Sequence, residues 1–317
     1  MTYLIVYSSI WLLRETSSLT RKRILHSLKN KEIQLAKYAG FCYGVKRAVE
    51  TVKKLKADNP EKEIYILGEL IHNSDVIKEL NDLGIKTIYE IPEKGNGICV
   101  IRSHGASPEI FEKLKKAGFE TVDLTCPDVK KVQQKAIQIA KDGYFLIIVG
   151  KSEHPEVMAI KANAELWTKD IAVATSFEQL AEYEEKIISH KKVGVVVQTT
   201  QRIDTLENII QYLIPRAKEL LIANTICPST AMRQKETIEL AKNNDLVIVV
   251  GSKKSANTSH LAEILKGLTK NIHIENDMEL DDYADVINSA ESIALTAGAS
   301  TPQNIIEKVV NKIKGGL

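Results

Sequence analysis

The feature that most constrains the fold is a regular alternation of short apolar runs with amphipathic stretches. Six runs are rich in Val, Ile and Leu: Glu63–Leu67, Ile98–Ile101, Tyr144–Val149, Val193–Val197, Asp245–Val250 and Ser292–Thr296. Five other stretches are apolar on one helical face: Val45–Lys56, Val129–Lys141, Thr205–Leu213, Gln234–Lys242 and Asn304–Lys314. Short strands separated by helices of this length predict βαβ units and parallel sheets.

Two of these runs, Phe145–Val149 and Leu246–Val250, are apolar at every position. A strand that is apolar on both faces must be covered on both sides, as in a parallel sheet flanked by helices. Open sheets of this kind bind ligands beyond the carboxyl ends of their strands. We therefore expect the functional residues in the turns that follow the strands.

Six strands are each followed by a turn of small or polar residues that opens a helix. The turns are Gly68–His72, Ser103–Pro108, Gly150–Pro155, Gln198–Thr200, Gly251–Ser255 and Ala297–Pro302. Taken in pairs they indicate a weak internal repeat, which predicts an α/β fold of three similar βα lobes, with small parallel sheets around a central cavity. The expected parts are an extension at 1–32 and lobes at 33–126, 127–223 and 224–317, the last with a C-terminal helix.

Composition excludes several classes of protein. The 317 residues are 44% hydrophobic and 26% charged, as in ordinary globular proteins. The net charge is +2 and aromatic residues make up only 5%, so no nucleic-acid partner is expected. Four cysteines are too few for a disulfide scaffold, and no convincing secretory signal precedes them. A reducing, cytoplasmic location is the resulting expectation.

The first 32 residues differ from the rest of the chain. Tyr3–Leu13 is apolar, but 11 residues cannot span a bilayer, so no membrane association is expected. Basic residues follow this stretch instead of preceding it, which argues against a signal peptide. The Ser and Arg content of Arg14–Arg23 leaves a transit peptide open. We expect a poorly ordered or artefactual extension, with the body beginning near Ile33.

Three of the four cysteines, Cys42, Cys126 and Cys227, stand on short turns. Gaps of 84 and 101 residues separate them, so any shared site must be assembled by the fold. Two of them precede proline, an arrangement that recurs beside cluster cysteines. The set suits an iron–sulfur cluster with one open iron, a Cys₃His zinc site, or three unrelated buried thiols. No CxxC pair favours zinc, and Cys99, within an apolar strand, is expected in the core.

Three histidines, His72, His104 and His154, fall at equivalent strand-to-helix turns. The other four lie in polar surroundings that need no explanation: His26, His190, His260 and His273. Each turn histidine taken singly could be a helix cap or a surface residue. Together, imidazoles at helix N-termini can donate hydrogen bonds to an anion.

Hydroxyl and amide side chains cluster at the same turns. They are Thr199, Thr200, Ser255, Asn257, Ser300 and Thr301. Each could simply cap a helix, but together they would form an uncharged, donor-rich pocket for phosphate. Gly298 would allow close approach of the backbone to such a ligand. Neither GxxxxGK[ST] nor GxGxxG occurs, so nucleotide binding has no support.

Glu156 is the one carboxylate within this set of residues. A solvent-facing glutamate in a first helical turn is the ordinary interpretation. Beside a reducing metal centre, the same carboxyl would be the natural proton donor.

Ten short strings resemble those of the LytB/IspH-type 4-hydroxy-3-methylbut-2-enyl diphosphate reductases, which catalyse the last step of the non-mevalonate isoprenoid pathway. The strings are Ala39–Val45, Gly68–Asn73, Arg102–Gly105, Thr125–Pro127, His154–Val157, Gln198–Thr200, Thr225–Cys227, Arg233–Gln234, Gly251–Asn257 and Thr296–Ser300. They occur in family order over nearly all the chain except the extension. The combination is highly specific.

This resemblance implies a cofactor, a site and a reaction. Cys42, Cys126 and Cys227 would hold one [4Fe–4S] cluster per subunit in the central cavity, with one iron not ligated by protein. The implied substrate-binding residues are His72, His104, His154, Thr199, Ser255, Asn257 and Ser300. An external donor of the ferredoxin or flavodoxin type would supply two electrons, and Glu156 with Thr199 would supply protons. The reaction would convert (E)-4-hydroxy-3-methylbut-2-enyl diphosphate to isopentenyl diphosphate and dimethylallyl diphosphate.

The chain departs from the family pattern at two places. Ala256 stands where members often carry a second serine, and Pro228–Thr230 replaces a common x-Ala-Thr. We expect these departures to affect binding strength and not the reaction. Two other classes stay open: an iron–sulfur sensor, which would not need Glu156 and Thr199, and a zinc-dependent hydrolase.

Overall fold

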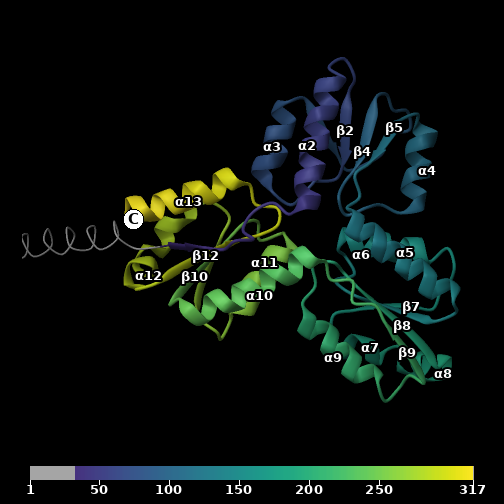
Figure 1. Ribbon diagram of the computed structural model, residues 1–317. Helices are drawn as coiled ribbons and strands as arrows, with labels where there is room; N and C mark the ends of the chain where they lie inside the picture. Colours follow the sequence, from purple (N-terminus) through teal and green to yellow (C-terminus); the bar gives the residue numbers. More distant parts are fainter. Residues whose placement is uncertain (1–32, 317) are drawn as a thin grey trace, which may run out of the picture.

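The computed structural model describes residues 33–316 and arranges three parallel sheets of four strands around a common centre (Figure 1). The expected α/β class with small parallel sheets is therefore confirmed. We call the parts built on these sheets the first, second and third lobes. The extension at 1–32, and its expected disorder, lie outside the described residues.

The first lobe contains a sheet of order β3-β2-β4-β5. Its strands are β2 (Ile64–Leu67), β3 (Ile85–Ile88), β4 (Ile98–Ile101) and β5 (Glu120–Asp123). Its helices are α2 (Tyr43–Asp58), α3 (Ser74–Asp82) and α4 (Pro108–Ala117). Cys99 on β4 is fully buried beside Leu114 and Phe119, so its predicted place in the core is confirmed.

The second lobe contains a sheet of order β7-β6-β8-β9. Its strands are β6 (Phe145–Val149), β7 (Ile171–Ala174), β8 (Lys192–Val197) and β9 (Glu219–Ile222). Its helices are α5 (Pro127–Lys141), α6 (Pro155–Ala164), α7 (Phe177–Ala181), α8 (Glu184–His190) and α9 (Ile203–Leu213). Alternate residues of β6 pack into two separate clusters, one on each face of the sheet. This is the two-sided burial expected of an all-apolar strand.

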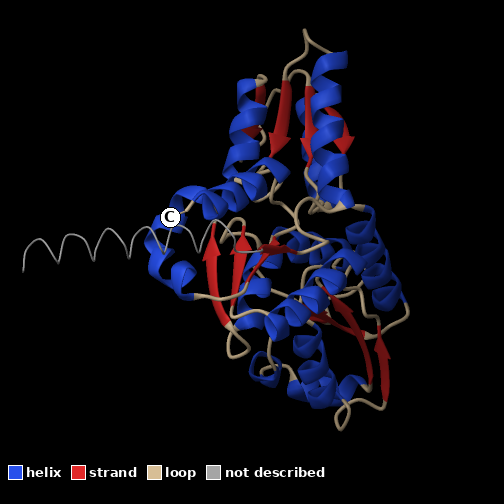
Figure 2. Cartoon of the chain, turned by 60° about the vertical axis from the view of Figure 1, so that its left-hand side comes forward, coloured by secondary structure: helices blue, strands red, loops and turns tan. Residues whose placement is uncertain are grey.

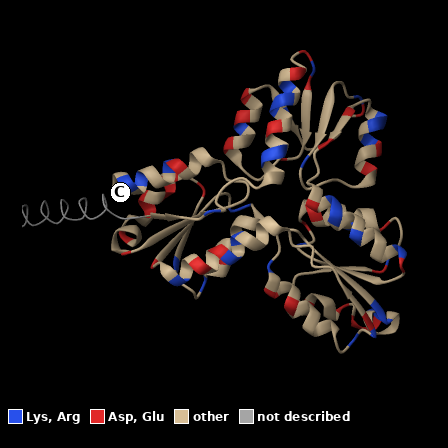
Figure 3. Cartoon of the chain, in the orientation of Figure 1, with Lys and Arg blue, Asp and Glu red and all other residues tan. Residues whose placement is uncertain are grey.

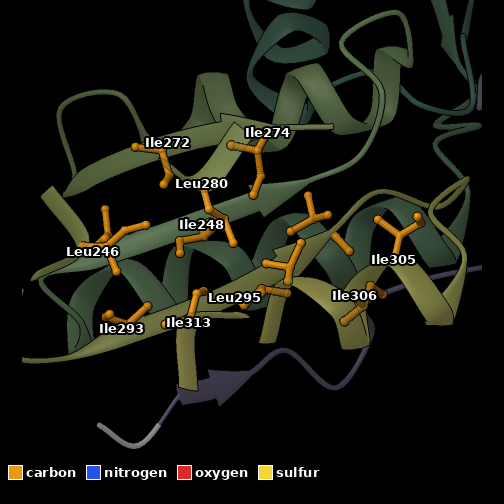
Figure 4. Close-up of a cluster of buried hydrophobic side chains, with 14 of the residues drawn as sticks. Leu246, Ile248, Ile272, Ile274, Leu280, Ile293, Leu295, Ile305, Ile306 and Ile313 are labelled. Atoms are coloured by element: carbon orange, nitrogen blue, oxygen red, sulfur yellow. The ribbon is translucent and has the colours of Figure 1, made fainter. Parts of the chain in front are cut away.

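The third lobe contains a sheet of order β1-β12-β10-β11. Its strands are β1 (Ile33–Leu35), β10 (Leu246–Val250), β11 (Lys270–Ile274) and β12 (Ile293–Ala297). Its helices are α10 (Pro228–Asn243), α11 (Ala256–Leu265), the short 3₁₀ helix η1 (Asp277–Tyr283), α12 (Ala284–Ser289) and α13 (Gln303–Gly315). Leu246, Ile248 and Leu295 pack against Ile306 and Ile313 of α13 in its core (Figure 4).

Strand β1 pairs in parallel with β12, so the beginning of the described chain lies in the third sheet. Its residues fall within the range 33–126 that the sequence analysis assigned to one lobe. Because sheet pairing joins segments about 260 residues apart in the chain, no local pattern could reveal it. The division of the chain at 126 and 223 stays a prediction.

The turns at the carboxyl ends of the strands meet where the three lobes come together (Figures 1 and 2). Charged positions lie mainly on the outer helices, and the strands carry few (Figure 3). No helix among residues 33–316 is both long and apolar enough to cross a membrane. The centre of the molecule is therefore built from the polar turns that the sequence analysis singled out.

Candidate functional site

The cavity at the centre is lined by residues of all three lobes. Among the residues that line it are Cys42, Cys126, Cys227, His72, His104, Glu156, Thr199, Ser255, Asn257 and Ser300. These include nearly every candidate from the sequence. His154 lies just behind the lining, with its ring centroid 5.3 Å from that of His104.

The three cysteines occupy equivalent places in the three sheets. Cys126 follows edge strand β5, Cys227 follows edge strand β9, and Cys42 follows edge strand β1. Strand β1 is thus the edge strand of the third sheet that precedes a cysteine, as β5 and β9 are in the other two sheets. The repeat brings thiols that are far apart in sequence to one cavity.

Close packing around Gly44 shows how near two of the sulfurs lie. A Cβ atom added to Gly44 would stand 2.8 Å from Cys126 Sγ and 3.9 Å from Cys42 Sγ. Burial raises the pKa of Cys126 and of Cys227, and the nearby Cys42 raises both further. Only a residue without a side chain leaves space between these sulfurs.

Each cysteine also stands at the start of a helix. Cys42 Sγ accepts the Val45 N–H of α2 at 3.4 Å, and Cys227 Sγ accepts the Thr230 N–H of α10 at 3.3 Å. Cys126 occupies the same position at the start of α5. Backbone N–H groups and helix N-termini favour thiolates over thiols. Together with the space at Gly44, this donor set fits an iron–sulfur cluster held by three cysteines.

Arg233 is a buried cation next to the cysteine side of the cavity. Its side chain is buried and donates to the Gly40 carbonyl at 2.6 Å. Burial lowers the pKa of this guanidinium, while Cys42 and Cys227 raise it. A cation held here favours negative sulfur ligands.

The three histidines form one compact group on the other side of the cavity. The rings of His72 and His104 stack at 5.0 Å, and that of His154 lies 6.2 Å from His72. Burial places the pKa of His104 well below 6.5, and burial with the charges of His72 and Arg102 lowers that of His154 to about 4. Both imidazoles are therefore neutral near pH 7.

One nitrogen of each histidine lies within 4.8 Å of the others, which is a spacing that could hold a metal ion. The hydrogen bonding favours an anion instead. His154 Nδ1 accepts the Glu156 N–H at 3.2 Å, so its proton is on Nε2, which is then a donor. His72 Nδ1 lies 3.0 Å from Glu69 Oε2, which holds that ring in place.

Amide and hydroxyl groups of the third lobe also belong to the histidine side of the cavity. Asn257 is 4% exposed, and neither of its amide atoms has a hydrogen-bond partner within residues 33–316. The same is true of His104 Nδ1. Ser300 Oγ donates to the His72 carbonyl at 3.3 Å, and Ser255 caps α11. Buried polar atoms are normally paired, so unpaired ones facing a cavity indicate a polar ligand.

Glu156 lies between the cysteine side and the histidine side of the cavity. Its side chain is 1% exposed; Oε1 accepts the Thr199 N–H at 2.6 Å and Oε2 accepts the Thr199 hydroxyl at 2.7 Å. Burial raises the pKa of this carboxyl to about 7, although both bonds from Thr199 lower it. The solvent-facing interpretation is therefore wrong. A carboxyl with this pKa can give up and regain a proton near neutral pH.

One buried histidine was not predicted from the sequence to have a role here. His260 was placed in polar surroundings, but it is 3% exposed and its Nδ1 lies 2.8 Å from the Thr200 carbonyl. Gln234 Nε2 donates to the Gln201 carbonyl at 3.1 Å. Two side chains of the third lobe thus hold the turn that carries Thr199. His260 lies three residues after Asn257, on the same helical face, which is the signal that could have found it.

Comparison with known proteins identifies the family. A family model described as LytB protein matches residues 33–314. The chain belongs to the LytB family. The resemblance seen in the sequence is therefore confirmed, and the match covers all but the last two of the residues that the structure describes.

LytB relatives match over most of their own length. A protein of Geobacter sulfurreducens named 4-hydroxy-3-methylbut-2-enyl diphosphate reductase is 40% identical over 284 residues, which cover 89% of this chain and 97% of the relative. A solved (E)-4-hydroxy-3-methyl-but-2-enyl diphosphate reductase, described as the terminal enzyme of the non-mevalonate pathway, is 35% identical with a TM-score of 0.67. The match covers 89% of this chain and 98% of that one.

A second solved LytB structure is more similar in shape although less similar in sequence. This is the E-1-hydroxy-2-methyl-but-2-enyl-4-diphosphate reductase of Plasmodium falciparum, at 30% identity and a TM-score of 0.80, covering 89% of this chain and 87% of that one. The three-sheet fold is thus shared with both solved relatives.

Proposed function

We propose that this chain reduces (E)-4-hydroxy-3-methylbut-2-enyl diphosphate to isopentenyl diphosphate and dimethylallyl diphosphate. One observation carries the proposal: a buried carboxyl with a pKa near 7 faces the same cavity as three cysteines and two of the three histidines. The curated Geobacter relative carries the name of this reductase. Neither a zinc hydrolase nor a sensor accounts for all of these groups.

The cofactor of the proposal is a [4Fe–4S] cluster held by Cys42, Cys126 and Cys227. When bound, it would supply electrons and, at the iron not ligated by protein, a Lewis acid for the C–O bond of the substrate. The chain's own contribution is to hold the thiolates in place through helix N-termini and to support them with the buried Arg233.

The diphosphate binds at the histidine side. The cavity lining, within the described residues, contains no Lys or Arg, so neutral donors must hold the anion. His154 Nε2–H, the Asn257 amide and the Ser255 hydroxyl are such donors, with His72 and His104 beside them, and the Ser300 hydroxyl becomes one when it turns from the His72 carbonyl to the ligand. The N-termini of α6 and α11 add backbone dipoles that favour negative charge.

Glu156 supplies protons for removal of the hydroxyl as water and for the new C–H bond. Thr199 binds both carboxyl oxygens, so it fixes the direction of the carboxyl and passes its hydroxyl proton into the same network. Since the pKa is near 7, the carboxyl is partly protonated at neutral pH and can be recharged between steps.

Reduction requires an external electron donor, and we propose a small carrier of the ferredoxin or flavodoxin type. Free thiols that must stay reduced suit the cytoplasm. We also propose that the chain divides into the units 33–126, 127–223 and 224–317, with Cys42 and Cys126 in the first of them and Cys227 in the third.

Anaerobic purification followed by a turnover assay tests the proposal. The expected product is a brown protein that converts the allylic diphosphate when a reductant is added. A colourless, zinc-loaded protein would favour the hydrolase, and a brown protein without turnover would favour the sensor. Glu156→Gln keeps the volume of the side chain, and it should keep the colour while losing most turnover.

A further inference from the structure

A tyrosine and an aspartate join the first two lobes at the edge of the cysteine cavity. Tyr43 directly follows Cys42 at the start of α2, and Asp128 lies two residues after Cys126 in the first turn of α5. The Tyr43 hydroxyl donates to Asp128 Oδ2 at 2.8 Å. The same hydroxyl oxygen is 4.0 Å from Cys126 Sγ.

Asp128 is unusual among the charged groups of this region because its side chain is only 12% exposed. It lines the cavity, where Glu156 is the one other carboxylate among the described lining residues. Its Oδ1 lies 2.9 Å from Lys131 Nζ, so a different donor serves each oxygen. The charge of Asp128 also reaches Cys227 in the next lobe.

A fixed carboxylate so close to a redox centre opposes the arrival of an electron. Donors that bind the carboxylate withdraw part of its charge and weaken that opposition. Hydrogen bonds and net charge around the sulfur ligands are the means by which a protein sets the reduction potential of an iron–sulfur cluster. Beside these sulfur ligands, Tyr43 supplies a hydrogen-bond donor and Asp128 supplies a charge.

We propose that the Tyr43–Asp128 pair sets the reduction potential of the cluster held by the three cysteines. Asp128 makes reduction harder, and the Tyr43 hydroxyl offsets part of that effect. The inference rests on the proposed function, and it makes both residues positioning residues, without a direct part in bond breaking.

Two substitutions separate this role from simple bridging of the lobes. Tyr43→Phe keeps the ring and removes the donor, so the carboxylate acts with less compensation and the potential becomes more negative. Asp128→Asn keeps the shape and removes the charge, so the potential becomes more positive. A purely structural bridge would be lost in Tyr43→Phe but kept in Asp128→Asn, whose amide oxygen still accepts from the Tyr43 hydroxyl, so only Tyr43→Phe would shift the potential.

The chain offers a matched control in a second tyrosine–carboxylate pair. The Tyr144 hydroxyl binds Glu219 at the amino ends of β6 and β9, the opposite ends from the turns that carry the cavity residues. Tyr144→Phe removes the same kind of hydrogen bond. It should leave the potential unchanged.

The experiment measures the reduction potential of anaerobically prepared, cluster-loaded protein by titration followed by electron paramagnetic resonance. Thermal unfolding of each variant checks that it is folded. We expect opposite shifts for Tyr43→Phe and Asp128→Asn, each larger than that of Tyr144→Phe. Adding Tyr43→Phe to Asp128→Asn should shift the potential much less than it does alone.

Shifts in the same direction, or shifts no larger than that of the control, would overturn the inference. In that case a brown protein with normal turnover leaves the proposed function intact. A protein that takes up no iron and sulfide overturns both, because no potential exists to be set. The two failures are therefore distinguishable.

Discussion

The two sides of the central cavity solve opposite problems with the same structural device, the start of a helix. On the cysteine side, the sulfurs of Cys42 and Cys227 accept backbone N–H groups, and Arg233 lies beneath them. On the histidine side, His154 uses its Nδ1 in the same way, which leaves its proton on Nε2 as a donor. One side is prepared to hold ligands with negative charge of their own, and the other to receive a negative ligand.

What a helix N-terminus can bind therefore depends on the residue that caps it. A thiol at the cap accepts the N–H groups and becomes a better metal ligand. An imidazole accepts one N–H group and becomes a fixed donor. Glu156 lies in the first turn of a histidine-capped helix, at the meeting point of the two sides.

Removal of one sulfur from the cysteine side should have the largest effect. Cys227→Ser keeps a hydrogen-bond acceptor at the cap of α10 but gives a poor iron ligand. We expect loss of most bound iron and of turnover, while the helix and the fold remain. Iron analysis with circular dichroism measures both. Retention of full iron content by Cys227→Ser would remove this cysteine from the site.

Loss of the proton donor should be the next largest effect. Glu156→Gln should lower kcat by about 10²–10⁴-fold, the usual contribution of a positioned acid. Iron content should not change, because the carboxamide keeps the volume and can still bind Thr199. Steady-state kinetics with parallel iron analysis separates the two sides of the cavity. Unchanged kcat would mean that protons come from elsewhere.

A substitution on the histidine side should act on binding. Asn257→Ala removes a donor to the diphosphate, and a hydrogen bond to a charged group contributes about 1.5–3 kcal/mol. KM should therefore rise by about 10–100-fold, with little change in iron content. Because both amide atoms lack partners within residues 33–316, the ligand-free variant should be no less stable than the parent. A large loss of stability with unchanged KM would show a structural role instead.

The raised pKa of Glu156 also predicts a pH dependence of stability. Between about pH 4.5 and pH 7 the folded carboxyl keeps its proton while the unfolded one has lost it, so stability decreases as pH rises. The decrease is at most about 3 kcal/mol, since one pKa unit corresponds to about 1.4 kcal/mol. Denaturant unfolding across this range measures the free energy of unfolding of the parent and of Glu156→Gln. The difference between the two should change in favour of the variant as pH rises to 7, and it should be constant above pH 7. Parallel curves would mean that the carboxyl has an ordinary pKa.

The smallest effect is expected at Ala256, at the start of α11 beside Ser255. Ala256→Ser restores a hydroxyl that relatives of the resembled family often carry. One neutral hydrogen bond contributes about 0.5–1.5 kcal/mol, so KM should fall by about 2–10-fold. Competition kinetics against the parent protein measures a difference of this size. An increase in KM would mean that the hydroxyl crowds the diphosphate.

The sequence predicted the six inner strands of the sheets and missed the six edge strands. Inner strands such as β6 and β10 are buried on both faces and appear as unbroken apolar runs. The edge strand β5, for example, carries charges at both ends, Glu120 and Asp123, and shows no such run. The five predicted helices correspond to α2, α5, α9, α10 and α13, but their starts were missed by up to six residues, as at α10. The helices α3 and α4 were not among them.

Residues that line the cavity could be picked out in the sequence because they stand out locally. Cysteines before proline and histidines in polar turns can be recognised without tertiary information. The roles of His260 and of the Tyr43–Asp128 pair could not, because each depends on a contact between lobes. The same is true of β1, whose partner β12 lies at the other end of the chain.

Anaerobic measurement of iron and acid-labile sulfide in the purified protein decides whether the three cysteines hold an iron–sulfur cluster. We expect about four of each per chain, as one cubane cluster requires. Zinc in place of iron, or iron without sulfide, would contradict it.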